Sequence, residues 1–172
     1  SRPTTMPTVP LKDLTAWLDA LLRPAELPDY PGALNGLQLE NAGTVTHLAA
    51  AVDWSRAAVD GAAAVGRGGL LLVHHGMFWG GAQPIVGAAY GRLRAAMDAD
   101  LAVYGAHLPL DAHPELGNNA RLARTLGLEP TGTFLRYKTL DVGVQGAADV
   151  ETAALAARAT AFAAEHGHHT VH

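Results

Sequence analysis

The sequence of 172 residues contains no cysteine and only two serines. The absence of cysteine excludes disulfide bonds, thiolate metal ligands and cysteine nucleophiles, and it fits a reducing compartment. The serines, Ser1 and Ser55, do not lie in a G-x-S-x-G motif, and neither a P-loop nor a dinucleotide-binding glycine motif is present. We therefore expect a cytoplasmic protein whose chemistry does not depend on a serine or cysteine nucleophile.

Long apolar runs and a strong charge of either sign are also missing. Runs such as Leu70–Val73 are far below the ~20 residues that a membrane-spanning helix needs. Twelve basic and sixteen acidic residues give a net charge of -4, which provides no general attraction to nucleic acid or to an anionic membrane. We expect no membrane or nucleic-acid partner, and the 49% hydrophobic content is typical of a globular protein.

Helix and strand patterns alternate along the chain. Apolar residues between Leu11 and Leu22 recur at the spacing of one helical face, and Pro24 then disfavours continuation. Leu70–Val73 is continuously apolar, as expected for a parallel strand that is covered on both faces. This alternation predicts an α/β fold with a mixed or mostly parallel sheet flanked by helices. The other expected helices are 55–65, 86–99, 118–126 and 153–164, and the other strands are 47–52, 101–106 and 140–145.

Polar side chains follow two of the predicted strands. His74 and His75 come directly after Val73, and His107 and Asp111 follow the strand 101–106. Because the carboxyl ends of parallel strands meet at one edge of a sheet, we expect these groups to lie close together. Imidazole and carboxylate ligands together suit zinc, manganese, iron or cobalt, whereas calcium and magnesium prefer oxygen ligands alone. The alternative is that these are ordinary polar residues of surface loops.

The adjacent histidines raise a question of geometry. Successive residues of a strand point to opposite faces, so His74 and His75 cannot converge on one ion while the backbone stays regular. Either the strand ends before them, or each histidine serves a different ion.

Three stretches of the chain resemble a known family. They are Asn35-Gly36-Leu37-Gln38, the histidine pair within VHHGMFW, and the long run AHLPLDAHPELGNNARLA, which begins at Ala106. In this order they resemble the NIF-three-like dinuclear-metal proteins, which are homologues of GTP cyclohydrolase I type two. The resemblance implies a cytoplasmic protein of NIF-three-like fold, a toroidal homohexamer, and two divalent ions that face an inner cavity. It also implies that His74 and His75 are shared between the ions and that Asp111 completes one shell.

The family pattern continues with a G-H-x-x-x-E segment that this sequence lacks. The match covers about residues 9–146, so we expect a metal-ligand-bearing α/β domain over 1–146 and the start of a truncated second segment over 147–172. The histidines of this tail are better interpreted as a solvated helix end than as the missing ligands; they are His166, His168, His169 and His172.

Three further residues are candidates for the same site. His107 is a candidate ligand, proton shuttle or residue that orients a ligand, and the last role ranks first. Asn35 and Gln38 either line the cavity or cap a turn before a strand. The resemblance implies a metal-dependent hydrolase that acts on a nucleotide such as GTP or on a phosphoester. The competing hypothesis is a non-catalytic metal-binding assembly or regulatory interaction protein, because fold and ligands are common to both.

Overall fold

The computed structural model describes residues 7–167 and divides the chain into two compact units, Ser1–Leu110 and Asp111–His172. This division lies between Leu110 and Asp111, and the segment boundary that the sequence suggested near residue 146 stays a prediction. Each unit is therefore described by itself.

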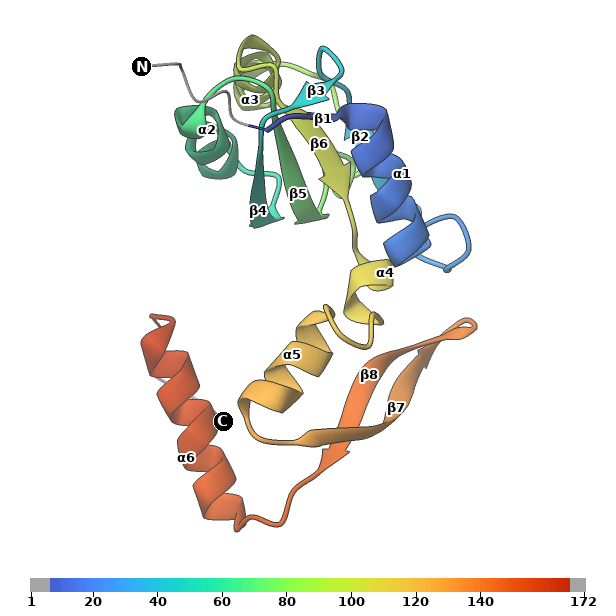
Figure 1. The fold of residues 1–172 in the computed structure, drawn as a ribbon, viewed down its shortest axis with the longest axis vertical. Coiled ribbons are helices and arrows are strands. Elements are labelled where there is room, and N and C mark those ends of the chain that lie inside the picture. The colour runs from blue at the N-terminus through green and yellow to red at the C-terminus, as the bar shows by residue number, and fades with distance from the viewer. Residues whose placement is uncertain (1–6, 168–172) are drawn as a thin grey trace. The chain divides into compact units, whose positions relative to one another are not determined.

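A four-stranded sheet forms the centre of the first unit. Its strand order is β2 (Gly36–Leu39), β6 (Ala102–Gly105), β5 (Gly69–His75) and β4 (His47–Asp53). The strands β4, β5 and β6 are parallel and end at the same edge (Figure 1), while β2 runs antiparallel to β6. The sheet is thus mixed, and the predicted α/β class is confirmed. The sequence suggested a turn before a strand near Asn35 and Gln38 without giving the strand bounds, and β2 is short and contains a register shift between Leu37 and Leu39.

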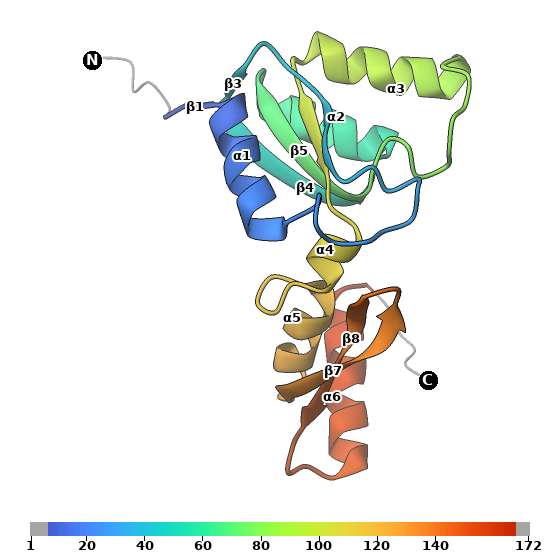
Figure 2. The same cartoon turned by 90° about the vertical axis from the view of Figure 1, so that its right-hand side faces the viewer.

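Helices cover both faces of this sheet. Figure 2 shows α1 (Leu11–Leu22) on one side and α2 (Arg56–Val65) and α3 (Gly87–Asp98) on the other. Alternate residues of β5 enter two separate cores: Leu70 packs with α1, and Leu71 and Val73 pack with Val59 of α2. This explains the continuous apolar run, because each face of the strand is buried against a helix layer.

The first helix matches its predicted bounds. Leu11, Leu18 and Leu22 are buried together with Thr15, so one stripe of α1 faces the core. The helix ends at Arg23, whose φ of 54° is left-handed, immediately before Pro24. A short two-stranded sheet of β1 (Val9–Pro10) and β3 (Thr44–Val45) flanks it.

The second unit begins at the end of α4 (Leu108–Asp111) and contains α5 (Asn118–Thr125) and a hairpin. The hairpin pairs β7 (Glu129–Tyr137) with β8 (Leu140–Ala147). The sequence predicted β8 but not β7. The segment of β7 contains Pro130 and Gly132, residue types that usually mark turns and loops. The last element, α6 (Thr152–Glu165), buries none of its side chains.

Of the four tail histidines, only His166 belongs to the described part of the chain. Its Nδ1 lies 2.8 Å from the carbonyl oxygen of Phe162, one turn earlier in the helix. His168, His169 and His172 lie outside the described residues, so their interpretation stays a prediction.

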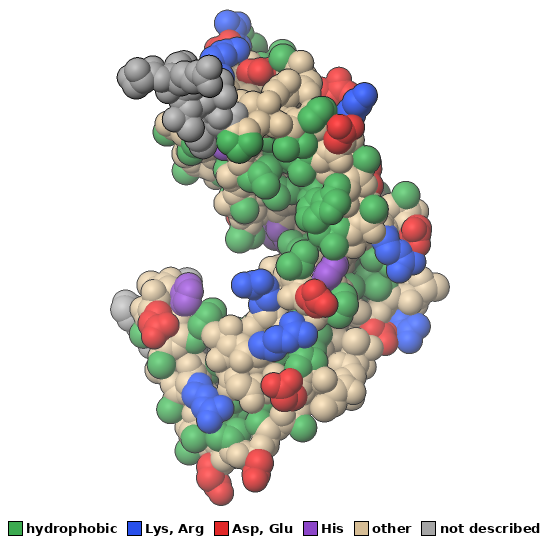
Figure 3. All heavy atoms as spheres, in the orientation of Figure 1, with side chains coloured by type: hydrophobic (Ala, Val, Ile, Leu, Met, Phe, Trp, Pro, Cys, Tyr) green, Lys and Arg blue, Asp and Glu red, His purple; other side chains and the backbone are tan. Residues whose placement is uncertain are grey.

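The surface of the first unit is partly hydrophobic. Figure 3 shows apolar side chains gathered over its sheet. The exposed large ones include Trp17 on α1 and Leu48 and Val52 on the edge strand β4. Among the residues from 7 to 167, no helix is both long enough and apolar enough to cross a bilayer.

Candidate metal centre

Three histidines meet at the edge where the parallel strands end. Within residues 7–167, His74, His75 and His107 form a group of potential metal ligands whose donor atoms all lie within 4.8 Å of one another. The ring of His74 is centred 4.7 Å from that of His75 and 4.7 Å from that of His107. The pair on β5 therefore converges although His75 is still the last residue of the strand. His107 follows β6, so the expected meeting of two strand ends is observed.

A buried carboxylate holds His107 in place. The imidazole of His107 is 9% exposed, and its Nδ1 lies 2.7 Å from Oδ1 of Asp29, whose side chain is 7% exposed. A neutral histidine that donates from Nδ1 to a carboxylate keeps the lone pair of Nε2 for a metal ion. The contact with Asp29 therefore sets both the ring orientation and the tautomer that metal binding requires.

Asp29 accepts hydrogen bonds on both carboxylate oxygens. Oδ1 accepts from Tyr30 N and His107 Nδ1, and Oδ2 accepts from Asn35 Nδ2 at 2.7 Å and from Leu108 N at 2.8 Å. Burial by itself raises the pKa of Asp29, but the hydrogen bonds from Asn35, His107, Tyr30 and Leu108 outweigh it and lower that pKa. Asp29 is thus a carboxylate that remains charged in spite of its burial.

His75 has the same kind of partner in a more open setting. Its Nδ1 lies 2.7 Å from Oδ1 of Asp53, whose side chain is 66% exposed. Asp53 is the last residue of β4 and is the direct neighbour of His75 in the parallel register. It is not the cap of α2, because Ser55 Oγ accepts the hydrogen bond from Ala58 N. Two of the three imidazoles are therefore fixed by carboxylates from other elements.

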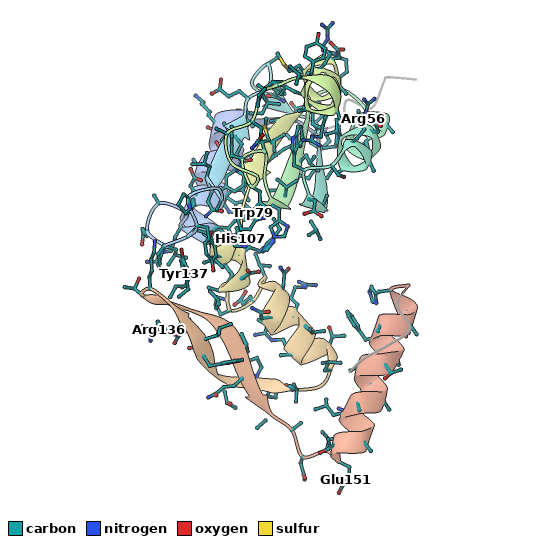
Figure 4. The ribbon with its side chains drawn as sticks, turned by 180° about the vertical axis from the view of Figure 1, so that it is seen from behind. Arg56, Trp79, His107, Arg136, Tyr137 and Glu151 are labelled. Carbon is teal, nitrogen blue, oxygen red and sulfur yellow. The ribbon has the colours of Figure 1, made fainter. Side chains whose placement is uncertain are left out.

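Aromatic rings enclose one side of the histidine group. Trp79 stacks on His75 at 4.7 Å between centroids with 24° between the planes, and it lies 4.3 Å from His107. Figure 4 labels Trp79 and His107 next to each other at this end of the first unit. Tyr30 adds an edge-on contact with Trp79 at 6.2 Å. These rings shield the imidazoles from water on the side where they pack.

Asn35 and Gln38 support the site through backbone contacts. Asn35 Oδ1 accepts from His107 N at 2.8 Å, while its amide group donates to Asp29. Gln38 Oε1 accepts from Met77 N at 2.7 Å, and its Nε2 donates to the carbonyl oxygens of Ala33 and Leu34 at 2.9 Å each. Gln38 thus ties the loop after β5 to the turn before β2.

Two glycines make room for this glutamine. A Cβ at Gly76 would lie 2.3 Å from Gln38 Oε1, and a Cβ at Gly105 would lie 2.4 Å from Gln38 Nε2. Such separations are far below any non-bonded contact, so no larger residue fits at either position while Gln38 keeps its hydrogen bonds. The glycine after His75 is therefore a packing requirement of the site.

Asp111 is the last residue of α4 and the first of the second unit. Its Oδ1 accepts a hydrogen bond from Asn118 Nδ2 at 3.0 Å within that unit. The group of potential ligands described above consists of the three histidines, and the role of Asp111 as a metal ligand stays a prediction.

The sequence did not single out three residues that shape the site, namely Asp29, Asp53 and Trp79. A signal for Asp53 existed, because it ends the strand that precedes β5 and parallel register places it beside His75. Asp29 lies in a proline-rich loop between α1 and β2, 78 positions before its histidine, and nothing local announces that contact. Trp79 is the last residue of the stretch VHHGMFW, but nothing in that stretch indicated that its ring would pack on the histidines.

Comparison with known proteins finds one matching family and relatives of greater length. The family model described as Duf34/NIF3 (NGG1p interacting factor 3) matches residues 9–170. A Deinococcus radiodurans protein named GTP cyclohydrolase 1 type 2 homolog is 46% identical over 134 residues, 78% of this chain and 50% of that protein. A Treponema pallidum protein of the same name is 42% identical over 136 residues, 78% of this chain and 47% of that protein.

A solved structure extends the likeness to the fold. The crystal structure of a protein from Thermus thermophilus superposes with a TM-score of 0.80 at 36% identity, covering 91% of this chain and 62% of that one. The present chain spans about half the length of the curated relatives that it matches.

Proposed function

Because this chain belongs to the Duf34/NIF3 family, we propose that it binds divalent transition-metal ions at His74, His75 and His107 and hydrolyses a substrate held beside them. The observation that carries the proposal is the pairing of His107 with Asp29 and of His75 with Asp53, each at 2.7 Å. Carboxylate–histidine pairs of this kind orient metal ligands.

The donor set fits a transition metal. Nitrogen ligands at about 2.0–2.1 Å from one ion are separated by no more than about 4 Å. The donor atoms of the three histidines lie within 4.8 Å, so small side-chain rotations bring them to that spacing. Neutral imidazoles favour zinc, iron, cobalt or manganese over calcium and magnesium.

A second ion requires ligands beyond these three imidazoles. Asp111, the last residue of α4, is the predicted carboxylate ligand. We propose that the complete centre is dinuclear, as the resemblance to the family implies, and that the protein is a homohexamer. Light scattering of the purified chain tests the hexamer, because a monomer mass would contradict it.

Within this proposal the protein residues have separate tasks. A bound divalent ion would act as a Lewis acid, which lowers the pKa of water and polarises a carbonyl or phosphoryl group. Asp29 and Asp53 accept from Nδ1 of their histidines, which orients each ring and leaves the Nε2 lone pair of the neutral ring as the ligand atom. Trp79 covers His75 and His107 and keeps bulk water from that side. The name of the relatives points to GTP. One water would add to the carbon between the two imidazole nitrogens of the purine and break one C–N bond, and a second water would hydrolyse the resulting formamide and release formate.

Metal content tests the binding half of the proposal. Protein that has been treated with chelator, reloaded with zinc, manganese, iron or cobalt and desalted should retain ion by elemental analysis. Three imidazoles without further ligands should hold fewer than two tight ions per chain, and His74→Ala, His75→Ala and His107→Ala should each lower the content. His166→Ala is the matched control, because this exposed histidine lies in α6's C-terminal cap. Equal metal content in all four variants would refute the site.

Turnover tests the other half. Metal-loaded protein should release formate from GTP, or hydrolyse a phosphoester, at a rate that His75→Ala abolishes and His166→Ala leaves unchanged. If the protein binds metal but wild type and His75→Ala hydrolyse the substrates at the same rate, the hydrolase hypothesis is refuted. The hypothesis of a non-catalytic metal-binding assembly would then stand.

A further inference from the structure

A second feature of the first unit is a cavity of about 540 Å³ that opens beside His75. It is bounded by the ends of β4 and β5, by the loop that follows β5, and by α3. Its volume lies within the usual range for small-molecule sites, roughly 300–1,000 Å³. The walls are largely aromatic or apolar, and the residues concerned are Trp54, Met77, Phe78, Trp79 and Ile85.

Arg92 brings a positive charge to this wall. Its Nε is buried and has no hydrogen-bond partner among residues 7–167. Its Cζ lies 5.6 Å from the ring centroid of Trp54, a cation–π contact, and Trp54 is only 9% exposed. The neighbouring arginines differ: Arg56 and Arg94 each pair with an aspartate one helical turn away at 2.8 Å.

The charges of the cavity are arranged unevenly. Asp53 is the carboxylate of the lining, and it is already engaged by Nδ1 of His75 at 2.7 Å. Nε of Arg92 has no hydrogen-bond partner among the described residues. A buried guanidinium N–H without an acceptor is unfavourable, and a ligand anion beside Arg92 would supply one. Guanidinium groups bind carboxylates and phosphates through paired hydrogen bonds, so an anionic ligand group is the complement of Arg92.

We propose that this cavity binds a planar aromatic ligand that carries a carboxylate or phosphate, with the ring against the aromatic wall and the anion on Arg92. Aromatic side chains such as Trp54 and Phe78 pack favourably on a flat ring. The proposal rests on the proposed function in one respect: His75 lines both sites, so the uncharged end of the ligand faces the metal-binding histidines. It adds to that function the cavity that would hold the ring and a positioning residue, Arg92, for the anion.

Calorimetric titration of the full chain in excess chelator tests the proposal without any contribution from metal. The probes are guanosine 5′-monophosphate and 2-naphthoate, with guanosine and inorganic phosphate as the ring alone and the anion alone. Each aromatic anion that binds should do so at least roughly tenfold more tightly than guanosine or phosphate. Preference for guanosine 5′-monophosphate identifies the anion as a phosphate, and preference for 2-naphthoate identifies a carboxylate.

Variants on α3 separate charge from packing. Arg92→Met keeps an apolar stem against Trp54 but removes the charge, and should weaken binding of the preferred probe roughly tenfold or more. Arg94→Met removes an exposed, paired charge from the same helix and should leave binding unchanged. If Arg92→Met does not fold, Arg92→Lys keeps the charge without the planar fork and should show a smaller loss.

Two results would overturn the proposal: no probe binds more tightly than guanosine or phosphate, or the Arg92 and Arg94 variants bind alike. Because metal is absent throughout, failure here leaves the metal site untouched. Failure of the metal assays likewise leaves this ligand site standing.

Discussion

The buried carboxylate of Asp29 offers the sharpest test of how the candidate centre is built. Replacing Asp29 by Asn keeps the size and shape of the side chain but turns one acceptor oxygen into an amide donor. Each carboxylate oxygen accepts two hydrogen bonds in the structure, Oδ1 from Tyr30 and His107 and Oδ2 from Asn35 and Leu108. The NH₂ group is best tolerated at the Oδ1 position, where it faces Tyr30 N and Nδ1 of His107, because a neutral imidazole can switch tautomer and accept through Nδ1.

The size of the effect follows from the lost charge. A hydrogen bond to a charged acceptor contributes about 1.5–3 kcal/mol, so the loss of the carboxylate charge should cost at least about 1.5 kcal/mol of unfolding free energy. Metal affinity should fall as well, by about ten- to a hundredfold, because His107 loses the group that fixes its tautomer.

Asp53→Asn is the matched control. Asp53 makes the same 2.7 Å contact with a histidine Nδ1, but its side chain is 66% exposed. The amide oxygen of Asn can accept from His75 while the NH₂ group faces water, so the change in unfolding free energy should stay within about 0.5 kcal/mol.

Urea unfolding of metal-free protein, followed by tryptophan fluorescence, measures this difference. All three tryptophans, Trp17, Trp54 and Trp79, lie in the first unit, so the signal reports on the unit that contains Asp29. A loss below about 0.5 kcal/mol for Asp29→Asn, or equal losses for both variants, would refute the account of Asp29 as a buried, fully engaged acceptor.

Two further predictions concern a glycine beside the site and a buried tyrosine. Gly105→Ala would place a Cβ 2.4 Å from Gln38 Nε2 and displace the amide group that accepts from Met77 N. It should cost about 1–3 kcal/mol of unfolding free energy in the same urea assay. The same cost in a Gln38→Ala background would contradict this cause. Burial, reinforced by the 2.7 Å hydrogen bond to Asp19, raises the pKa of Tyr104, so the folded state loses stability as pH rises above the unfolded value of about 10. Tyr104→Phe should flatten that alkaline decline, and identical slopes for wild type and variant above pH 10 would argue against it.

Periodic hydrophobic patterns in the sequence predicted most of the helices and strands. The helix Leu11–Leu22 was predicted to the residue, and β5 was recognised from its apolar run, because both signals are local and repeat along the chain. The strand β7 was missed and β2 was suggested only without bounds, and both outcomes have a physical reason. A four-residue antiparallel strand has too few side chains to show alternation, and in β7 the residues Pro130 and Gly132 mimic a turn.

The site was predictable as far as parallel strands dictate it. His74 and His75 end β5 and His107 follows the adjacent strand β6, so sheet topology alone brings them to one edge. Orientation was not predictable in the same way. Asp29 reaches His107 from a loop 78 residues away, and only the packing of that loop against the sheet creates the contact.

The carboxylate–imidazole pairs imply that the candidate centre is preorganised. Asp29 and Asp53 position His107 and His75 through contacts that the polypeptide makes by itself. In small zinc domains, by contrast, the ion supplies much of the folding free energy and its removal unfolds the chain. Here an ion could leave and be replaced without refolding, so the metal found in the protein would report which ion is abundant where it works.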